Sequence, residues 1–490
     1  MRQSEALAIL NAGANVFLTG APGAGKTYVL NEFIRGARAD GASVAVTAST
    51  GIAATHVDGQ TIHSWSGVGL ATVLDARLLK TIRTRRRRKI QAADVLVIDE
   101  VSMLHAWLFD MVDQVCRDLR RDPRPFGGLQ VVLSGDLFQL PPVSTSQRNR
   151  DVVPPSPEFV ASRERYMRRG LDPEGFVTES LVWPELNPVV CYLTEQHRQD
   201  DGRLLTVLTH IRESRVDDDD RDTLVTRLGV APEAGTVATH LFPVNRQADN
   251  LNDMRLARIM GEAHEFHAEQ AGPANLVERL TRNMLAPQRL VLKAGAAVMA
   301  LRNDTDRQYV NGSLGTVRGF ADENKGGWPI VEFENGNIVT MKPASWEMMD
   351  GETVLASVKQ VPLRCAWAIT IHKSQGMTLD RAVMDLRRTF APGMGYVALS
   401  RVESLDGLYL EGVNNRMFAV SDDAVRLDGS LREASAAAAD RLAGDGADAF
   451  KPGLGLGGGF GGGGGGGGAA GGDATAGAAT DDGFTQSALF

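Results

Sequence analysis

Gly20–Thr27, with the sequence GAPGAGKT, decides the fold of this 490-residue chain. It fits the pattern G-x-x-x-x-G-K-[ST] of a phosphate-binding loop. The apolar run Val16–Thr19 precedes it, and a helical pattern that places Val29, Leu30 and Phe33 on one face follows. Glycines let main-chain N–H groups converge on phosphate oxygens, and the helix N terminus adds the positive end of its dipole. Strand, glycine-rich turn and helix together predict a bound nucleoside triphosphate.

The residue types within this loop assign individual roles. Gly23, Ala24 and Gly25 are expected to present their backbone N–H groups to phosphate. Lys26 is expected to reach the β- and γ-phosphates, and the Thr27 hydroxyl to ligate Mg²⁺. ATP and Mg²⁺ are therefore the cofactors that the loop predicts.

Composition narrows the class of protein. Hydrophobic residues make up 43% of the chain and the formal net charge is −8, which argues against an overall basic coat for wrapping nucleic acid. The cysteines Cys116, Cys191 and Cys365 are isolated, so they indicate neither a zinc site nor a disulfide framework. The start of the chain lacks a signal-peptide pattern and no run is long enough for a membrane span. We expect an intracellular protein of the cytoplasm or nucleoid, with no membrane partner.

Short β-rich runs alternate with helical patterns over residues 1–190. The runs are Val16–Thr19, Ser43–Thr47, Val95–Ile98 and Gln130–Leu133. Their continuous hydrophobicity is typical of strands buried on both faces, and hence of a parallel α/β sheet. We predict one P-loop ATPase domain here.

A second α/β domain is predicted for residues 191–302 and 362–430. Its candidate strands are Thr239–Phe242, Ala366–Ile371, Ala382–Leu386 and Leu408–Leu410. Between its two parts, turn signals such as Asn335-Gly336 separate short strands such as Ile330–Phe333. We therefore predict a small β-barrel at 303–361, inserted in the second domain.

Two segments have the composition of irregular structure. Residues 145–175 are charged and proline-bearing, and we interpret them as an insertion or mobile loop. Residues 431–490 are predicted to be a disordered tail, because glycines such as the unbroken Gly461–Gly468 dominate it. The tail ends in the acidic, aromatic tip Asp481–Phe490, which is either an unselected solvated end or a protein-docking peptide.

Carboxylates and an amide follow the buried strands of the first domain. Asp99 and Glu100 end the run Val95–Ile98, so Asp99 is expected to hold the Mg²⁺ shell and Glu100 to polarise the attacking water. Gln139, in GDLFQLPP after the next strand, is a candidate sensor of the γ-phosphate. Arg198 and Arg401 are candidates for the positive charge that phosphoryl transfer requires from across a two-domain cleft.

The order of these motifs resembles one family. TASTGIAA at 47–54 with Thr61–Trp65 looks like a helicase motif of the PIF-type DNA helicases, which are superfamily 1 motors related to RecD. The stretch from Asp99 to Val143 is similar to the family signature, and WAITIHKSQGMTLD at 367–380 and Tyr396–Arg401 resemble its late motifs. The matches run from Gln3 to about Glu411.

The resemblance implies a fold and an activity. The fold is α/β, with two RecA-like P-loop domains with parallel sheets, a small wedge subdomain near 61–73 and an SH3-like barrel. The activity is ATP-driven 5′-to-3′ movement on single-stranded DNA with separation of duplex, in replication, repair or recombination. The expected partners are single-stranded and partly duplex DNA, and a monomer is expected. Trp65 and Leu137 stand where family members often carry phenylalanine.

The resemblance also assigns further site residues. Gln3 is expected at the adenine, and Gln375 and Gly376 at the nucleotide. The residues expected to line the DNA track are Thr50, Gly51, His63, Thr370, His372 and Lys373.

Two charged runs have more than one interpretation, and two other functions fit the motifs. The run Arg85–Lys89 is either a solvated helix face or a nucleic-acid patch. Asp217–Asp220 lacks the glycine and final glutamate of a calcium loop, so it favours a helix start. The rivals to a stand-alone motor are a RecD-like subunit of a larger complex and a nucleotide-gated switch without strand separation.

Overall fold

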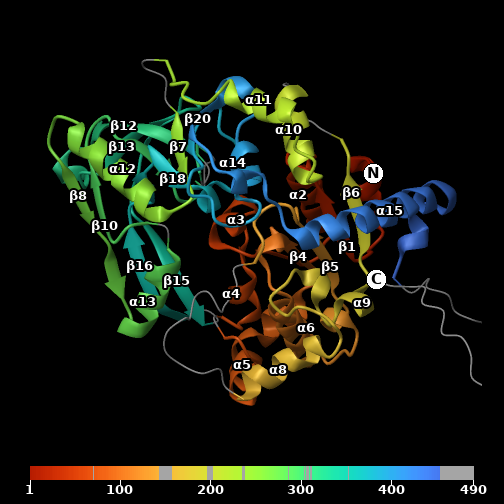
Figure 1. Ribbon diagram of the computed structural model, residues 1–490. Helices are drawn as coiled ribbons and strands as arrows, with labels where there is room; N and C mark the ends of the chain where they lie inside the picture. Colours follow the sequence, from red (N-terminus) through yellow and green to blue (C-terminus); the bar gives the residue numbers. More distant parts are fainter. Residues whose placement is uncertain are drawn as a thin grey trace, which may run out of the picture.

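The chain forms two lobes built on parallel sheets, with an antiparallel module beside them (Figure 1). No helix in the described part of the chain is long and apolar enough to cross a membrane. The computed structural model describes residues 1–69, 71–142, 157–195, 202–233, 238–284, 286–302, 304, 308–309, 312–350 and 353–452.

The first lobe (residues 1–195) contains a six-stranded sheet in the order β3-β2-β4-β5-β1-β6, in which all neighbouring strands are parallel. The four strand runs predicted for this region coincide with β1, β2, β4 and β5 and are confirmed. The strands are β1 (Val16–Gly20), β2 (Val44–Ala48), β3 (Gln60–Thr61), β4 (Val95–Asp99), β5 (Gln130–Ser134) and β6 (Val189–Leu193).

Helices cover both faces of this sheet, which explains its continuous hydrophobicity. Leu18 of β1 lies in one apolar cluster with Leu30 of α2, whereas its neighbour Phe17 lies in the opposite cluster with Phe109 of α6. The helices are α1 (Gln3–Asn11), α2 (Lys26–Ala39), α3 (Gly51–His56), α4 (Ile62–Ser66), α5 (Ala76–Ala92), α6 (Ala106–Arg120), α8 (Pro157–Met167) and α9 (Trp183–Leu186).

The second lobe contains a four-stranded parallel sheet in the order β18-β7-β19-β20, as its candidate strands predicted. Its apolar residues Leu241 and Ile369 belong to the same cluster as Phe109 of the first lobe, so one core runs across the seam between the lobes. The strands are β7 (Thr239–Phe242), β18 (Ala368–Thr370), β19 (Ala382–Asp385) and β20 (Leu408–Gly412), and the helices are α10 (Gly202–Arg212), α11 (Asp218–Val225), α12 (Asn245–Arg258) and α14 (Met394–Leu399).

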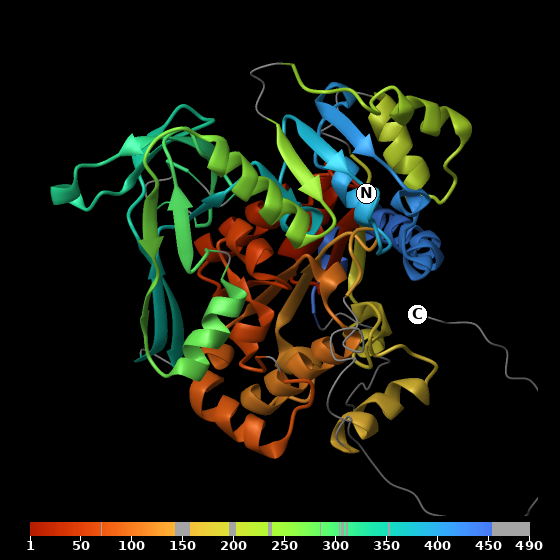
Figure 2. The same ribbon diagram turned by 60° about the vertical axis from the view of Figure 1, so that its left-hand side comes forward.

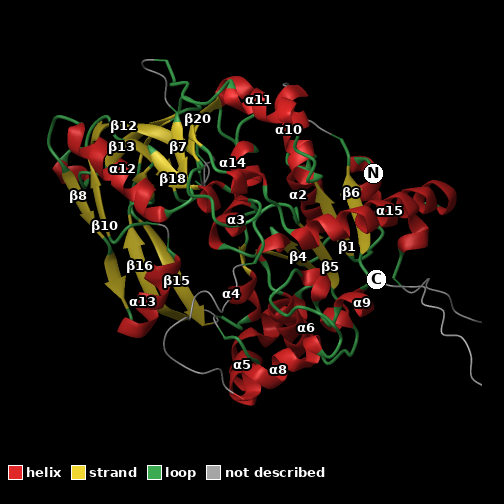
Figure 3. Cartoon of the chain, viewed as in Figure 1, coloured by secondary structure: helices red, strands yellow, loops and turns green. Residues whose placement is uncertain are grey.

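The antiparallel module (residues 264–365) projects from the second lobe (Figures 2 and 3). It contains sheets in the orders β14-β13-β12-β11-β17, β15-β16-β9 and β10-β8. The module begins before residue 303, where the sequence predicted its start. The prediction missed the first strands because they are short and lack the hairpin turns that mark the later ones. Its elements are β8 (His264–His267), β9 (Glu269–Ala271), α13 (Ala274–Asn283), β10 (Arg289–Leu292), β11 (Ala297–Ala300), β12 (Leu314–Phe320), β13 (Pro329–Phe333), β14 (Ile338–Thr340), β15 (Ala344–Asp350), β16 (Thr353–Gln360) and β17 (Leu363–Cys365).

The prediction of a disordered tail from residue 431 is wrong for residues 431–452. Helix α15 (Asp422–Asp445) continues through this segment and lies against β6, where Ser435 Oγ accepts a hydrogen bond of 2.9 Å from the Tyr192 N–H. Ala438 and Phe450 join the cluster beneath α1 and α2. The composition misled the prediction because alanine is a strong helix former that adds little hydrophobic volume. Residues 453–490, with the predicted docking tip, lie outside the described residues.

The interpretation of residues 145–175 as an irregular loop is also corrected in part. Pro157–Met167 form helix α8, and the Tyr166 hydroxyl donates a buried hydrogen bond of 2.5 Å to Asp110 of α6. Arg163 stacks over Trp107 with its guanidinium carbon 4.5 Å from the ring centroid. Residues 143–156 lie outside the described residues.

Candidate functional site

The glycine-rich loop joins β1 to α2 at the carboxyl edge of the first sheet. Gly25 precedes α2 with φ 86°, in the left-handed region, and a Cβ there would overlap the side-chain amide of Gln3. The N-cap of α2 is Gly25, which has no side chain to cap the first N–H groups of the helix, and a helix N terminus of this kind favours an anion. Thr27 is the second residue of that helix. The loop therefore has the geometry that phosphate binding requires.

Lys26 folds back on this loop. Its Nζ donates to the carbonyl oxygens of Gly20 at 2.8 Å and Ala21 at 3.1 Å. Burial lowers the pKa of Lys26, and the negative charges of Asp136 and Glu100 oppose that shift. The Lys26 ammonium therefore lies on the glycine-rich loop, near Asp136 and Glu100.

Asp99 and Glu100 stand at the end of β4. Burial raises the pKa of Asp99, and burial together with the charge of Asp99 raises the pKa of Glu100 to about 7. Glu100 has φ 50° and ψ 46°, a left-handed conformation that is strained for a glutamate and is found most often at functional sites. A carboxylate with a pKa near neutrality is suited to proton transfer.

Gln375 brings the second lobe to this carboxylate. It follows the short 3₁₀ turn after β18, and its Nε2 donates to Glu100 Oε2 at 3.0 Å and to Gln139 Oε1 at 3.1 Å. Gln139 lies in the turn after β5. The structure therefore brings together three of the predicted site residues, two from the first lobe and one from the second.

The two predicted arginines have different outcomes. Arg401 is buried, with hydrogen bonds to the carbonyl oxygens of Val397, Ser374 and Met377, and its charge lowers the pKa of Glu100. It therefore lies on the inner side of the seam rather than on the outer surface. Arg198 lies outside the described residues.

Gln3 and Gly376 flank the site. Gln3 Nε2 donates to the Ala24 carbonyl at 3.1 Å, and the Gln3 N–H donates to Glu195 Oε2 at 2.7 Å. Gly376 follows Gln375 directly and has φ 79°. Gln3 therefore lies against the phosphate loop, and Gly376 lies next to the residue that bridges the lobes.

The residues expected to face DNA follow the carboxyl ends of strands in both lobes, where α/β sheets place their ligands. In the first lobe, Thr50 precedes α3, Gly51 begins it, and His63 lies in α4. Ser49 joins this segment to the hydrolytic site, because its N–H donates to the Asp99 carbonyl at 3.1 Å and its hydroxyl to the Glu100 carbonyl at 2.7 Å.

In the second lobe, Thr370 ends β18, and His372 and Lys373 lie in the turn that follows. His372 stacks on Phe390, which is 54% exposed, with 6.4 Å between the ring centroids. Burial lowers the pKa of His372. Lys373 Nζ donates to Asn245 Oδ1 at 3.0 Å. The exposed aromatic ring gives this edge a stacking surface.

A groove of about 1370 Å³ lies between the first lobe and the antiparallel module. One wall is the basic face of α5, from Arg83 to Lys89, and the other includes Leu276 and Leu280 of α13. His63 also lines this groove. The run Arg85–Lys89 thus lies in helix α5, on the groove that borders the expected DNA surface.

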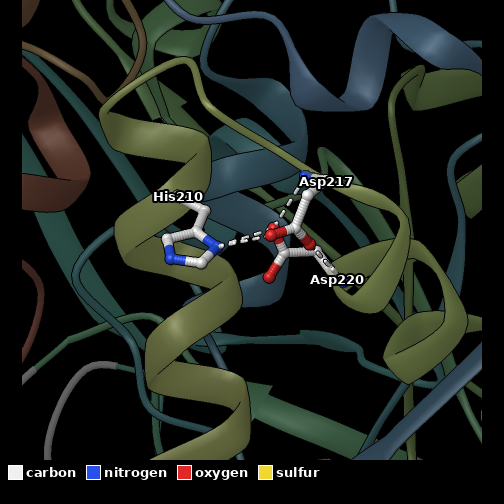
Figure 4. A group of neighbouring side chains, drawn as sticks. All are labelled: His210, Asp217 and Asp220. Carbon is white, nitrogen blue, oxygen red and sulfur yellow. Dashed lines mark hydrogen bonds and ion pairs between the residues drawn. The ribbon is translucent and has the colours of Figure 1, made fainter.

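The acidic run does not form a calcium loop. Asp217 caps α11, since its Oδ1 accepts from the Asp220 N–H at 2.9 Å, and this confirms the predicted helix start. Figure 4 shows His210 of α10 facing these carboxylates, with Nδ1 2.7 Å from Asp220 Oδ2 and 4.0 Å from Asp217 Oδ2. The cluster is explained as a helix cap joined to α10.

Arg212 is a buried charged residue that the sequence did not predict as part of the site. Arg212 ends α10 and bonds to Asp136 of the first lobe and Tyr396 of the second. Asp136 and Tyr396 lie within quoted motifs, but no motif surrounds Arg212, so only its buried position reveals it.

Comparison with known proteins agrees with this geometry. Residues 3–156 match the family model described as PIF1-like helicase, and residues 275–320 match the 2B domain of DNA helicase Pif1. The chain is 38% identical to the ATP-dependent DNA helicase Pif1 of Psychrobacter sp., covering 85% of this chain and 68% of the relative. It is 36% identical to human ATP-dependent DNA helicase PIF1, covering 82% of this chain and 60% of the longer human protein.

Solved structures give the same result. The Pif1 helicase of Candida albicans superposes with a TM-score of 0.75 at 32% identity, covering 88% of this chain and 98% of that one. Bacteroides Pif1 bound to single-stranded DNA superposes with a TM-score of 0.66 at 28% identity, covering 89% of this chain and 97% of that one. The chain therefore belongs to the Pif1 family of ATP-dependent DNA helicases.

Proposed function

We propose that this helicase hydrolyses ATP at the seam between its lobes and uses the cycle to move 5′-to-3′ along single-stranded DNA. The observation that carries this proposal is the amide of Gln375, which joins Glu100 and Gln139 across the seam. A nucleotide bound on the first lobe is then sensed by the second, and its cleavage changes how the lobes meet.

The residues at the seam fit a nucleotide with Mg²⁺. The loop is left-handed at Gly23 and Gly25, and Gln375 Oε1 is buried without a hydrogen-bond partner among the described residues. Lys26 would hold the β- and γ-phosphates, and Thr27 and Asp99 would hold the metal ion. When bound, Mg²⁺ neutralises charge that develops on the phosphate oxygens.

Glu100 acts as the general base in this proposal. Its pKa of about 7 lets it accept a proton from the attacking water near neutral pH. Gln139 reads the γ-phosphate, and Arg401, with Arg198, supplies positive charge to the transition state. Gln3 contacts adenine, and Gly376 leaves room for the nucleotide beside Gln375.

We propose that the DNA track runs over Thr50, Gly51, His63, Thr370, His372 and Lys373. Ser49 supports the coupling of the two sites, because it bonds the carbonyls of Asp99 and Glu100 directly before Thr50. The groove beside α5 extends the track, with phosphates against its arginines and unpaired bases against Leu276 and Leu280.

The finer domain assignment is part of the proposal. It comprises a first RecA-like domain at 1–190 with a wedge near 61–73, a second at 191–302 and 362–430, and an SH3-like insertion at 303–361. The match of residues 275–320 to a Pif1 2B domain supports an inserted module, one that begins before residue 303 as the antiparallel sheets do. We propose that the enzyme works as an intracellular monomer.

Unwinding of duplexes that carry a 5′ or a 3′ single-stranded overhang tests the proposal. We expect strand separation on the 5′-overhang substrate with ATP and none without it. Glu100→Gln is the matched control, because it keeps the shape of the site but removes the base. Preferential unwinding from the 3′ overhang, or unwinding without ATP, contradicts the proposal.

A second experiment tests the extension of the track along α5. Arg87→Gln with Arg88→Gln should weaken binding of a single-stranded oligonucleotide and reduce the salt slope by about 1.4, since each of the two lost phosphate contacts removes about 0.7 from the slope. Arg77→Gln with Lys80→Gln removes the same charge from the same helix outside the groove. Equal losses in the two variants would contradict a site in the groove.

A further inference from the structure

A buried charged cluster lies beneath the seam, around Arg212 at the end of α10. Its Nη1 donates to Asp136 Oδ1 at 2.7 Å and to the Tyr396 hydroxyl at 3.0 Å. Its Nε and Nη2 donate to the Tyr192 hydroxyl at 3.1 and 2.9 Å. The guanidinium thus joins β6, the turn after β5 and α14 of the second lobe.

The members of this cluster are isolated from solvent. Arg212 is 3% exposed, Asp136 0% and Tyr396 1%. Burial disfavours the charged guanidinium, but the negative charge of Asp136 holds the pKa of Arg212 well above its ordinary value. Burial raises the pKa of Tyr396, so its hydroxyl stays protonated and donates to Asp136 Oδ2 at 3.2 Å. A buried pair of this kind contributes little net stability but is costly to break, so it fixes geometry.

Arg212 shapes the turn that carries Gln139. Asp136 Oδ1 accepts from the Phe138 N–H at 3.2 Å, and the Asp136 carbonyl accepts from the Gln139 N–H at 3.0 Å. The Arg212 guanidinium also stacks on Phe138, with its carbon 4.2 Å from the ring centroid. The pair therefore holds the turn through Asp136 and through the ring of Phe138.

The second lobe packs on the same turn. Gly393 precedes α14, and a Cβ at this glycine would overlap the Gln139 carbonyl, so the two backbones are in direct contact. Tyr396, three residues later, completes the contact through Arg212 and Asp136. Asp136 and Arg212 are also close enough for their charges to shift the pKa of Lys26 in opposite directions.

We propose that Arg212 is a positioning residue and that it and the Tyr396 hydroxyl, both from the second lobe, make the interlobe contact with Asp136. Together they hold the Asp136–Gln139 turn in register with α14, so that Gln139 moves with the second lobe when the lobes close. The inference rests on the proposed role of Gln139 at the γ-phosphate. It adds a contact between the second lobe and the Asp136–Gln139 turn that does not involve the nucleotide.

Tyr396→Phe tests this connection, because it removes one hydroxyl and leaves the ring and both charges in place. We expect the DNA-stimulated kcat for ATP hydrolysis to fall about five- to tenfold, with KM for ATP within about twofold, the range that one lost hydrogen bond provides. Tyr166→Phe is the matched control, since it removes the tyrosine hydroxyl that donates a hydrogen bond to buried Asp110 in the first lobe. It should lower the melting temperature similarly and leave kcat unchanged.

A second variant separates charge from geometry. Arg212→Lys keeps the positive charge beside Asp136 but cannot bond Asp136, Tyr396 and Tyr192 at once. We expect its kcat to fall at least as far as that of Tyr396→Phe. A wild-type kcat in Tyr396→Phe, or equal losses of kcat in the Tyr396 and Tyr166 variants, would overturn the inference. The wild-type enzyme reports separately on the proposed function, through its own DNA-stimulated hydrolysis and overhang preference.

Discussion

Replacing Gln375 with leucine should raise the pH at which Glu100 becomes an active base. The Gln375 amide lies 3.0 Å from Glu100 Oε2 and stabilises the ionised carboxylate. Leucine has a similar size but no donor, so the charged form of Glu100 loses this bond while burial and Asp99 continue to oppose ionisation.

The structure sets the size of this shift. A hydrogen bond contributes about 0.5–1.5 kcal/mol net, and the amide is shared with Gln139, so we take this range rather than the larger one for charged partners. At about 1.4 kcal/mol per pKa unit, losing this hydrogen bond raises the pKa of Glu100 by about 0.4–1.1. From a pKa of about 7, the midpoint should rise to about 7.5–8.

The assay is the pH dependence of kcat/KM for ATP hydrolysis with saturating single-stranded DNA, which reports the ionisations of the free enzyme. Because the base must be deprotonated, kcat/KM should rise with pH through the midpoint in both enzymes, later in the variant. Gln114→Leu, at an exposed position of α6, is the control. A midpoint that stays in place or moves to lower pH in Gln375→Leu would refute the assigned contact.

Three further substitutions test the site and the fold. Lys26→Ala should abolish ATP hydrolysis while DNA affinity, measured by fluorescence anisotropy, changes little; normal turnover would reject the assigned phosphate site. Arg401→Ala should keep ATP binding, measured by calorimetry, and lose most of kcat; a matching loss of nucleotide affinity would make Arg401 a binding residue. Phe450→Ala should lower the free energy of unfolding by about 3 kcal/mol, because the ring is 7% exposed; an unchanged denaturation midpoint would contradict the packing of this C-terminal segment.

Local patterns predicted the parts of the protein that local physics determines. The strands β1, β2, β4 and β5 were found because both faces are buried, and Gly25 because a left-handed residue must precede α2. The start of α11 was predicted because Asp217–Asp220 lacks the glycine and glutamate of a calcium loop, and its acidic first turn complements the helix dipole.

The rest depends on contacts between distant residues. Gln375 lies 275 residues from Glu100 in sequence, and Arg212 lies 184 residues from Tyr396, so no local pattern shows that they meet. Helix α15 was missed for another reason. Its alanine-rich turns carry little hydrophobic signal by themselves, and they are held by β6 and by apolar residues of α1 and α2.

The packing of α15 on the first lobe also determines where a label or a surface anchor can be attached to the protein. Pro452 lies against Gly13, and the described chain ends there, on the side away from the antiparallel module (Figure 1). A fluorophore or surface anchor inserted directly after Pro452 would therefore be attached to the first lobe. It would leave the groove beside α5 open, which suits single-molecule tracking of an enzyme tethered by that end.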